Sequence, residues 1–230
     1  MAILVAHRGY SAVAPENTLA SLRAALKAGV LACEVDVRAT SDGEVVLMHD
    51  ETVDRTTDGH GRVGELNLEQ VKALDAGSWK GEAFCGERVP TLREALEVMR
   101  EGHLVIEVKE EGIEERVART VMEAGAQDRT TAISFSLEVC RRMRALIPEV
   151  GVLWLLGGGD EGAVVRALKA GVQGLDVHYR AITPEFAEAV LRRGLSLWAW
   201  TLEDPQEAGR LRDLGVSAIT SDDPIRLRGT

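Results

Sequence analysis

The chain has 230 residues, of which 45% are hydrophobic, so it can bury a sizeable core as one barrel-sized domain or two small ones. Asp and Glu number 37 against 27 Lys and Arg, and the net charge of −10 without a long basic run argues against a nucleic-acid partner. No segment approaches the roughly 20 apolar residues that span a bilayer, and residues 3–5 are too short for a signal-peptide core, so we expect a cytoplasmic protein without a membrane span.

The longest stretch without clear periodicity is residues 52–88. It still contains apolar residues and tryptophan, which is typical of an ordered excursion from a domain rather than of a flexible linker. We therefore expect residues 1–230 to form a single domain.

Short β-rich runs alternate with amphipathic helical stretches, as in repeated β-α units around a parallel sheet. Eight strands with this spacing favour an α/β fold of the (β/α)8 TIM-barrel class, whose size range includes this chain. An open doubly wound sheet is the alternative, but its dinucleotide-binding form lacks support because no G-x-G-x-x-G follows the first strand. The predicted strands are residues 3–6, 31–37, 45–48, 104–108, 131–134, 150–155, 174–177 and 196–201.

Helices are predicted between most of these strands. Most of them are followed by a glycine, which can adopt the left-handed conformation just past a helix. The predicted helices are residues 18–28, 91–100, 113–124, 137–147, 160–170, 184–193 and 205–214.

The connection between the second and third strands does not suit an ideal barrel. It consists only of residues 38–44, which contain the turn signal Ser41-Asp42-Gly43. No crossover helix fits there. Either the chain returns in extended form to keep the strands parallel, or the pair is a hairpin and the barrel is distorted at this link.

Ionisable residues follow several predicted strands, at the ends that form the active-site face of barrel enzymes. The first strand is followed by His7 and Arg8, and the third by His49 and Asp50. Taken alone, such a pair is as compatible with a purely structural role, a histidine that caps the strand and a charge on the surface, as with a functional one. Their recurrence at several strand ends favours a functional site.

Two strands also carry carboxylates. Glu34 and Asp36 point to one side of the second strand because strand side chains alternate. Inside a barrel they would need a cation or a shared proton, whereas on the solvent side of an edge strand they would need neither. On the fourth strand, Glu107 and Lys109 share a face, either as an ion pair or as a third metal ligand beside a cation for an anionic substrate.

These residue types together favour phosphodiester cleavage. Three carboxylates without a cysteine or histidine triad suit a hard cation, Mg²⁺ or Ca²⁺ with Mn²⁺ as a further candidate, rather than zinc. Such an ion beside Arg8 and Lys109 suits a phosphate, whose charge must be neutralised as the bond breaks. His7 and His49 could then serve as general base and general acid.

Short motifs in a characteristic order cover nearly the whole chain, and a chance match of so many is implausible. They are His7-Arg8-Gly9, Pro15-Glu16-Asn17-Thr18, Glu34-Val35-Asp36, Asp42-Gly43, His49-Asp50, Thr56-Thr57-Asp58-Gly59-His60-Gly61, Val89-Pro90-Thr91-Leu92, Glu107-Val108-Lys109, Ser134-Phe135, Trp200-Thr201 and Gly215-Val216. In these motifs the chain closely resembles the glycerophosphodiester phosphodiesterase family.

The resemblance implies a barrel fold and a small-molecule substrate. The implied reaction is hydrolysis of glycerophosphodiesters to sn-glycerol 3-phosphate and an alcohol, with one divalent cation required. The implied roles are acid–base catalysis by His7 and His49, metal binding by Glu34, Asp36 and Glu107, phosphate binding by Arg8 and Lys109, and a pocket wall formed by Phe135 and Trp200.

Residues 51–88 match a short insertion that this family carries, which we expect to wall the cleft. A lysophospholipase D activity is an alternative, for which Trp79 and Phe84 could supply an apolar lip. A non-catalytic glycerophosphate-binding barrel and a metal-dependent aldolase are further alternatives, and the two strand-end histidines argue against both.

Two departures from the family pattern stand out. Trp200-Thr201-Leu202-Glu203 places a carboxylate where many relatives have an amide, and Thr220-Ser221-Asp222-Asp223-Pro224 is one residue longer than the commoner form. The remaining histidines lack motif support, and we expect them to be loop, core or surface residues; they are His60, His103 and His178.

Overall fold

The computed structural model describes residues 2–228, within which nine strands form one sheet. Eight of them are parallel neighbours and close into a barrel, because β1 (Ile3–Ala6) pairs with both β2 (Ala32–Ala39) and β9 (Ala218–Ser221). The predicted (β/α)8 class is therefore confirmed. From β2 the ring continues through β4 (His103–Val108), β5 (Thr130–Ser134), β6 (Gly151–Leu156), β7 (Gly174–His178) and β8 (Ser196–Trp200) to β9.

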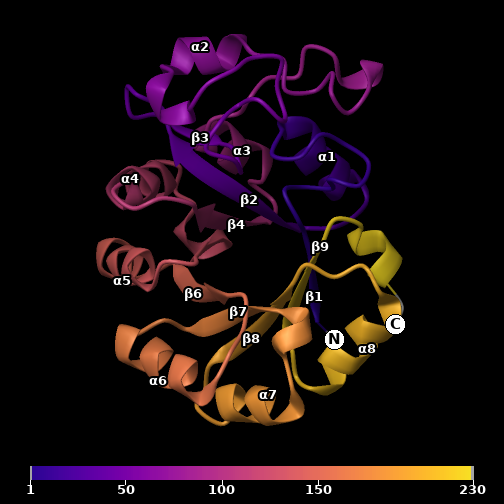
Figure 1. Ribbon diagram of the computed structural model, residues 1–230, viewed down its shortest axis with the longest axis vertical. Helices are drawn as coiled ribbons and strands as arrows, with labels where there is room; N and C mark the ends of the chain where they lie inside the picture. Colours follow the sequence, from indigo (N-terminus) through magenta and orange to yellow (C-terminus); the bar gives the residue numbers. More distant parts are fainter. Residues whose placement is uncertain (1, 229–230) are drawn as a thin grey trace.

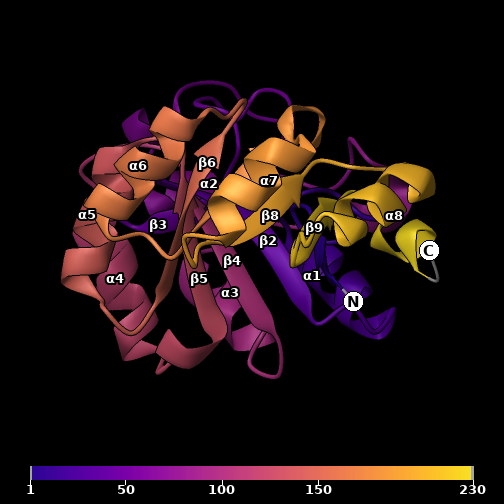
Figure 2. The same cartoon turned by 90° about the horizontal axis from the view of Figure 1, so that it is seen from below.

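Helices surround the strands (Figure 1), and Figure 2 shows the same molecule from below, with α5 and α6 at the left and α8 at the right. Several begin at a Ser, Thr or Asp whose side chain accepts a hydrogen bond from the first turn, as Thr91 does from the amide of Glu94. Within the described residues, no helix combines the length and apolar character needed to cross a bilayer. The helices that match predictions are α1 (Leu19–Lys27), α3 (Leu92–Val98), α4 (Glu114–Glu123), α5 (Leu137–Leu146), α6 (Glu161–Ala170), α7 (Pro184–Leu191) and α8 (Pro205–Asp213).

Of the two arrangements left open for residues 38–44, the hairpin is confirmed, so residues 45–48 do not supply one of the eight barrel strands. The strand β3 (Val45–Leu47) pairs antiparallel with β2 and extends the sheet as a hairpin outside the ring. Gly43, with φ of +88°, makes the turn. The eighth barrel strand is instead β9, which was not predicted because its four residues, Ala-Ile-Thr-Ser, contain one strongly apolar side chain.

The core has two layers that follow from strand alternation. The larger apolar cluster lies between the barrel and its helices and includes Leu175 and Val177 of β7. A smaller cluster fills the inside of the barrel, so the barrel is a packed core rather than a pore. That inner cluster consists of Val5, Ala32, Val105, Ile133, Leu153, Leu155 and Ala218, with Trp198 and Trp200 packed against it.

Residues 51–88 lie beyond the hairpin and contain the short helix α2 (Leu68–Ala73), at the top of Figure 1. An apolar cluster of their own, which includes Val53, Val63 and Val71, packs against Val46 of β3. The Lys80 ammonium donates to the carbonyl of Ser11, 2.7 Å away, which ties this segment to the loop after β1.

Candidate active site

A cavity of about 110 Å³ opens at the carboxyl ends of the barrel strands. Parallel strands bring their carboxyl ends together, so residues far apart in sequence meet there. Eight of the nine predicted site residues line this cavity, and the ninth, Asp36, lies beside them. The lining residues are His7, Arg8, Glu34, His49, Glu107, Lys109, Ile133, Phe135, Leu155, Asp176, Trp200, Thr201 and Thr220.

Three buried carboxylates form one cluster in the cavity wall. Glu34 and Asp36 of β2 and Glu107 of β4 each place a carboxylate oxygen so that these atoms lie within 4.8 Å of one another. Burial, with repulsion from Asp36 and Glu107, raises the pKa of Glu34 well above its usual range. Burial and the charge of Asp36 likewise raise the pKa of Glu107. The cluster therefore demands compensating positive charge.

Two cations supply part of that charge. Lys109 Nζ lies 2.7 Å from Glu107 Oε1 and 3.3 Å from Asp36 Oδ1, while Arg8 Nε lies 3.2 Å from Asp36 Oδ2. Burial opposes ionisation of Asp36, but Arg8 and Lys109 outweigh it and lower the pKa of this carboxyl. Of the three carboxyls, Asp36 is thus the one whose surroundings favour the ionised form.

The loop after β1, which carries Arg8, contacts the carboxylate cluster and has an unusual backbone conformation. Arg8 and Asn17 both adopt positive φ, 55° and 54°, which a non-glycine residue keeps only where its surroundings hold it. The Arg8 amide donates to Glu34 Oε2 at 3.0 Å, and the Asn17 side chain both donates to Asp36 Oδ2 and accepts from its amide. The strained loop is therefore held by the carboxylates themselves.

Each histidine at the cavity is oriented by an aspartate. His7 Nδ1 lies 2.6 Å from Asp222 Oδ1, and His49 Nδ1 lies 2.6 Å from Asp50 Oδ1. A carboxylate at Nδ1 holds the ring and leaves Nε2 to exchange a proton with a ligand in the cavity. Burial lowers the pKa of His49, although its bond to Asp50 acts in the opposite direction.

A chain of ion pairs links His49 to Arg8. Arg55 donates to Asp50 Oδ2 at 2.6 Å and to both oxygens of Glu16, which in turn accepts from Arg8 at 2.7 Å. Hydrogen bonds from Arg55 lower the pKa of Asp50, so this carboxylate stays charged beside the imidazole. This network of hydrogen bonds therefore links the position of His49 to that of Arg8.

The opposite side of the cavity is apolar. Phe135, half exposed, meets Trp200 edge to face with ring centroids 5.5 Å apart, and Trp200 also meets His178 at 5.2 Å. Ile133 and Leu155 form the floor beneath them. This wall offers shape and contact area rather than charge.

Two acidic residues of the site were not predicted. Asp222 lies 215 positions from His7, so only closure of the barrel brings them together. Asp176 could have been identified, because a single aspartate inside the apolar strand Gly174–His178 repeats the pattern of Glu34 and Asp36. The carboxylate of Glu203 does not line the cavity and instead accepts from the Asp222 amide and the Ser221 hydroxyl.

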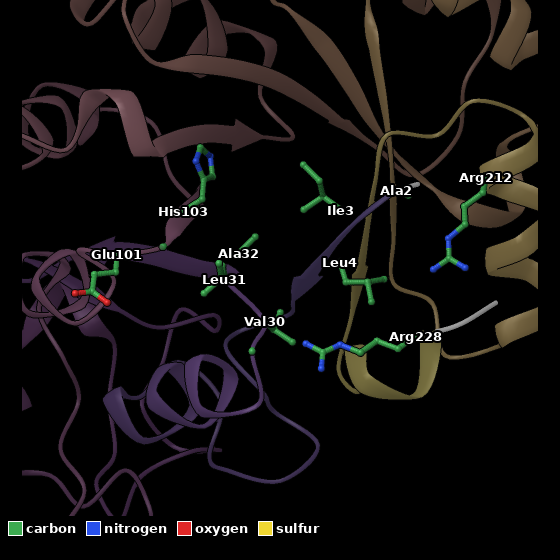
Figure 3. A pocket seen from close by; sticks show the side chains of 12 residues that line it. Ala2, Ile3, Leu4, Val30, Leu31, Ala32, Glu101, His103, Arg212 and Arg228 are labelled. Carbon is green, nitrogen blue, oxygen red and sulfur yellow. The ribbon is translucent and has the colours of Figure 1, made fainter.

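His60, His103 and a larger cavity lie away from this site, whereas His178 contacts Trp200 at its edge. The His60 side chain is 86% exposed, and His103 Nε2 lies 2.8 Å from the Thr131 hydroxyl. His103 lines a cavity of about 680 Å³ at the amino ends of the strands, with Ile3 and Leu31 among its apolar residues (Figure 3). Among the described residues, the only group of three or more potential metal ligands is the carboxylate cluster at the other end.

Comparisons with known proteins identify the family. The model of the glycerophosphoryl diester phosphodiesterase family matches residues 7–226. A glycerophosphodiester phosphodiesterase of Caldanaerobacter subterraneus subsp. tengcongensis is 35% identical over 234 residues, covering 98% of this chain and 96% of that protein.

Solved structures agree with the sequence comparisons. A phosphodiesterase from Oleispira antarctica, in complex with the product sn-glycerol-3-phosphate, has a TM-score of 0.91 at 33% identity, covering 98% of this chain and 94% of the other. A glycerophosphodiester phosphodiesterase from Agrobacterium tumefaciens strain C58 has a TM-score of 0.88 at 29% identity and is covered in full, as is this chain. The chain belongs to the glycerophosphoryl diester phosphodiesterase family.

Proposed function

We propose that the protein hydrolyses glycerophosphodiesters to sn-glycerol 3-phosphate and an alcohol with the help of one divalent cation. The observation that carries the proposal is the meeting of three buried carboxylates, two oriented histidines and two cations in one small cavity. The similarity to an enzyme bound to sn-glycerol-3-phosphate supports the choice of substrate.

The carboxylate cluster fits a hard cation. Its donors are all oxygen atoms, and their mutual distances suit ligands placed about 2.0–2.6 Å from a shared ion. Glu34 Oε1 is buried and has no hydrogen-bond partner among the described residues, which is costly without an ion. Glu34, Asp36 and Glu107 would hold Mg²⁺, Ca²⁺ or Mn²⁺, and the ion would supply positive charge to the phosphate oxygens as the phosphorus–oxygen bond breaks.

The histidines would move the protons. One Nε2 takes the proton of the attacking oxygen, and the other donates a proton to the departing alkoxide, so that the alcohol leaves neutral. The attacking group is water or the glycerol hydroxyl next to the phosphate, and the second route gives a cyclic phosphate that water then opens. Asp222 and Asp50 would keep the two imidazoles oriented throughout.

The other predicted residues would bind substrate. Arg8 and Lys109 lie beside the three carboxylates, on the side of the cavity that we call the charged wall, and would hold the phosphate. Phe135 with Trp200 would form the opposite, apolar wall. We further propose that residues 51–88 shape the entrance as part of the same functional unit, because Lys80 anchors them to the loop that carries Arg8.

Release of glycerol 3-phosphate from glycerophosphocholine and glycerophosphoethanolamine tests the proposal, with EDTA, Mg²⁺, Mn²⁺ and Ca²⁺ compared in parallel. Release that EDTA abolishes and one ion restores is the expected result. A cyclic phosphate in quenched samples would distinguish the two attacking groups. If folded, ion-loaded protein released no product, larger lipid diesters would be tested next, and binding without turnover would then replace the proposal.

A further inference from the structure

Asp176 is a buried carboxyl at the cavity to which nothing above gives a role. Its neighbours in β7, Leu175 and Val177, face the helices, so Asp176 points into the barrel. The residue is only 2% exposed, yet it lines the cavity. Its Oδ1 atom has no hydrogen-bond partner among the described residues.

The immediate surroundings of Asp176 are apolar. Strand register places Leu155 of β6 on one side of it and Trp198 of β8 on the other. Burial, with a smaller contribution from Glu107, raises the pKa of Asp176 to about 8. The carboxyl is therefore largely uncharged at neutral pH and can donate as well as accept a hydrogen bond.

An unpartnered carboxyl in such a place costs stability. A structural role would require partners that repay this cost, and Oδ1 has none among residues 2–228. A ligand in the cavity would supply one. Buried polar groups without hydrogen-bond partners are found mainly at functional sites.

The position of Asp176 indicates which part of a ligand it would meet. Three strands separate β7 from β2 in either direction around the ring, so Asp176 lies across the barrel from Glu34 and Asp36. The cavity between them is small, about 110 Å³. A phosphate held at the charged wall would therefore leave room at Asp176 for only a compact group.

We propose that Asp176 determines specificity for the glycerol half of the substrate by hydrogen bonding its terminal hydroxyl, the one farthest from the phosphate. This inference rests on the proposed function. The phosphate and the adjacent hydroxyl face the carboxylate cluster, and the terminal hydroxyl reaches the opposite wall. The leaving alcohol, which would vary between substrates, lies toward the open side near Phe135.

A pair of substrates tests the proposal with the full chain. Glycerophosphocholine is compared with 2-hydroxypropyl phosphocholine, which keeps the hydroxyl next to the phosphate and lacks only the terminal one. A site built around a hydroxyl discriminates against a ligand that lacks it, so we expect wild type to favour glycerophosphocholine in kcat/KM by roughly tenfold to a hundredfold.

Two variants complete the experiment. Asp176→Leu, close in shape to aspartate, should lower kcat/KM for glycerophosphocholine alone, so that the two substrates become equal within about threefold. Asp176→Asn, which retains hydrogen-bonding capacity, should keep part of the preference. Because Asp176→Leu also removes an unpartnered polar group from an apolar site, its Tm should equal or exceed that of wild type.

The outcomes separate this inference from the proposed function. Wild type that hydrolyses glycerophosphocholine without any preference over the analogue overturns the inference alone, and this measurement needs no variant to fold. An equal loss on both substrates in Asp176→Leu, with a lower Tm, would also overturn it in favour of a structural role. Wild type inactive on both substrates with every ion would overturn the proposed function and the inference with it.

Discussion

The two walls of the cavity differ in the kind of side chain that forms them. The wall formed by β1, β2 and β4 gathers charges of both signs, with Arg8 and Lys109 placed among three carboxylates. The wall formed by β5 to β8 and the residues after them is mainly apolar, with Asp176 and Thr201 as its polar residues. Under the proposed function, the first would bind and activate the phosphodiester, and the second would orient the substrate that the first holds. The contrast predicts that substitutions on the charged wall abolish turnover, while those opposite alter substrate preference.

Glu34→Gln gives the largest expected effect. Loss of one ligand should remove several kcal/mol of transition-state stabilisation, which lowers kcat/KM roughly a thousandfold or more. Calorimetry should show weakened binding of Mg²⁺ or Mn²⁺, while metal-free stability should not fall, because a mutual repulsion is removed. Glu97→Gln on the exposed surface of α3 is the control. Normal ion binding by Glu34→Gln would refute the assigned cation site.

His7→Ala and His49→Ala come next. Each removes a proton-transferring group, and turnover should fall by about a hundredfold to ten-thousandfold with little change in stability. His60→Ala, at an exposed loop histidine, should behave as wild type. Near-normal kcat in either cavity variant would contradict the acid–base assignment.

Asp50→Asn should have a smaller effect, about tenfold on kcat, because it disturbs the orientation of His49 without removing the ring. Asp50 raises the pKa of His49 through its hydrogen bond, so its loss should move the corresponding limb of the pH–rate profile to lower pH. Asp54→Asn is the matched control, since Asp54 pairs with His60 outside the cavity. Identical profiles for the two variants would exclude a positioning role.

The last prediction concerns stability rather than turnover and tests the apolar wall. Burial raises the pKa of Asp176 to about 8 from the usual 3.8, so between these values the folded state binds a proton that the unfolded chain has lost. Stability must then fall as the pH rises through that window, by at most about 1.4 kcal/mol per pH unit for one proton.

Urea unfolding in EDTA at pH 5, 6, 7 and 8 measures this dependence. Glu34 and Glu107, whose pKa values are also raised, contribute in the same direction in wild type. Asp176→Leu should retain their contribution and lose its own, so the stability gained by the variant should grow with pH. Parallel curves for the two proteins would show that Asp176 does not titrate in this range.

Much of the fold could be predicted because its signals are local. Apolar runs of four to eight residues, helix caps and glycines after helices each act over a few positions. The hairpin between β2 and β3 could not be predicted, because residues 38–44 suit either an extended return or a hairpin. Which of the two forms depends on which edge of β2 is free to pair. Strand β9 was not predicted because only one of its four side chains is strongly apolar, and its position is set by pairing with β1 and β8.

The candidate site divides in the same way. Four of the predicted residues follow strand ends or share a strand face, and the structure brings them together at one cavity: His7, Glu34, Asp36 and Glu107. The partners that orient them depend on contacts across the whole chain, as the hydrogen bond from Asn17 to Asp36 shows. Sequence patterns of short range therefore indicate the reacting groups better than the groups that hold them.

The contact between His7 and Asp222 also has a consequence for synthesis. His7 leaves the ribosome well before its aspartate, which follows 215 residues later, in the segment that also supplies β9. A growing chain can form most β-α units while the barrel remains open between β1 and β8. Nascent chains and fragments that end before residue 218 would lack both the closing strand and the oriented imidazole, so activity would begin only when the ring is complete.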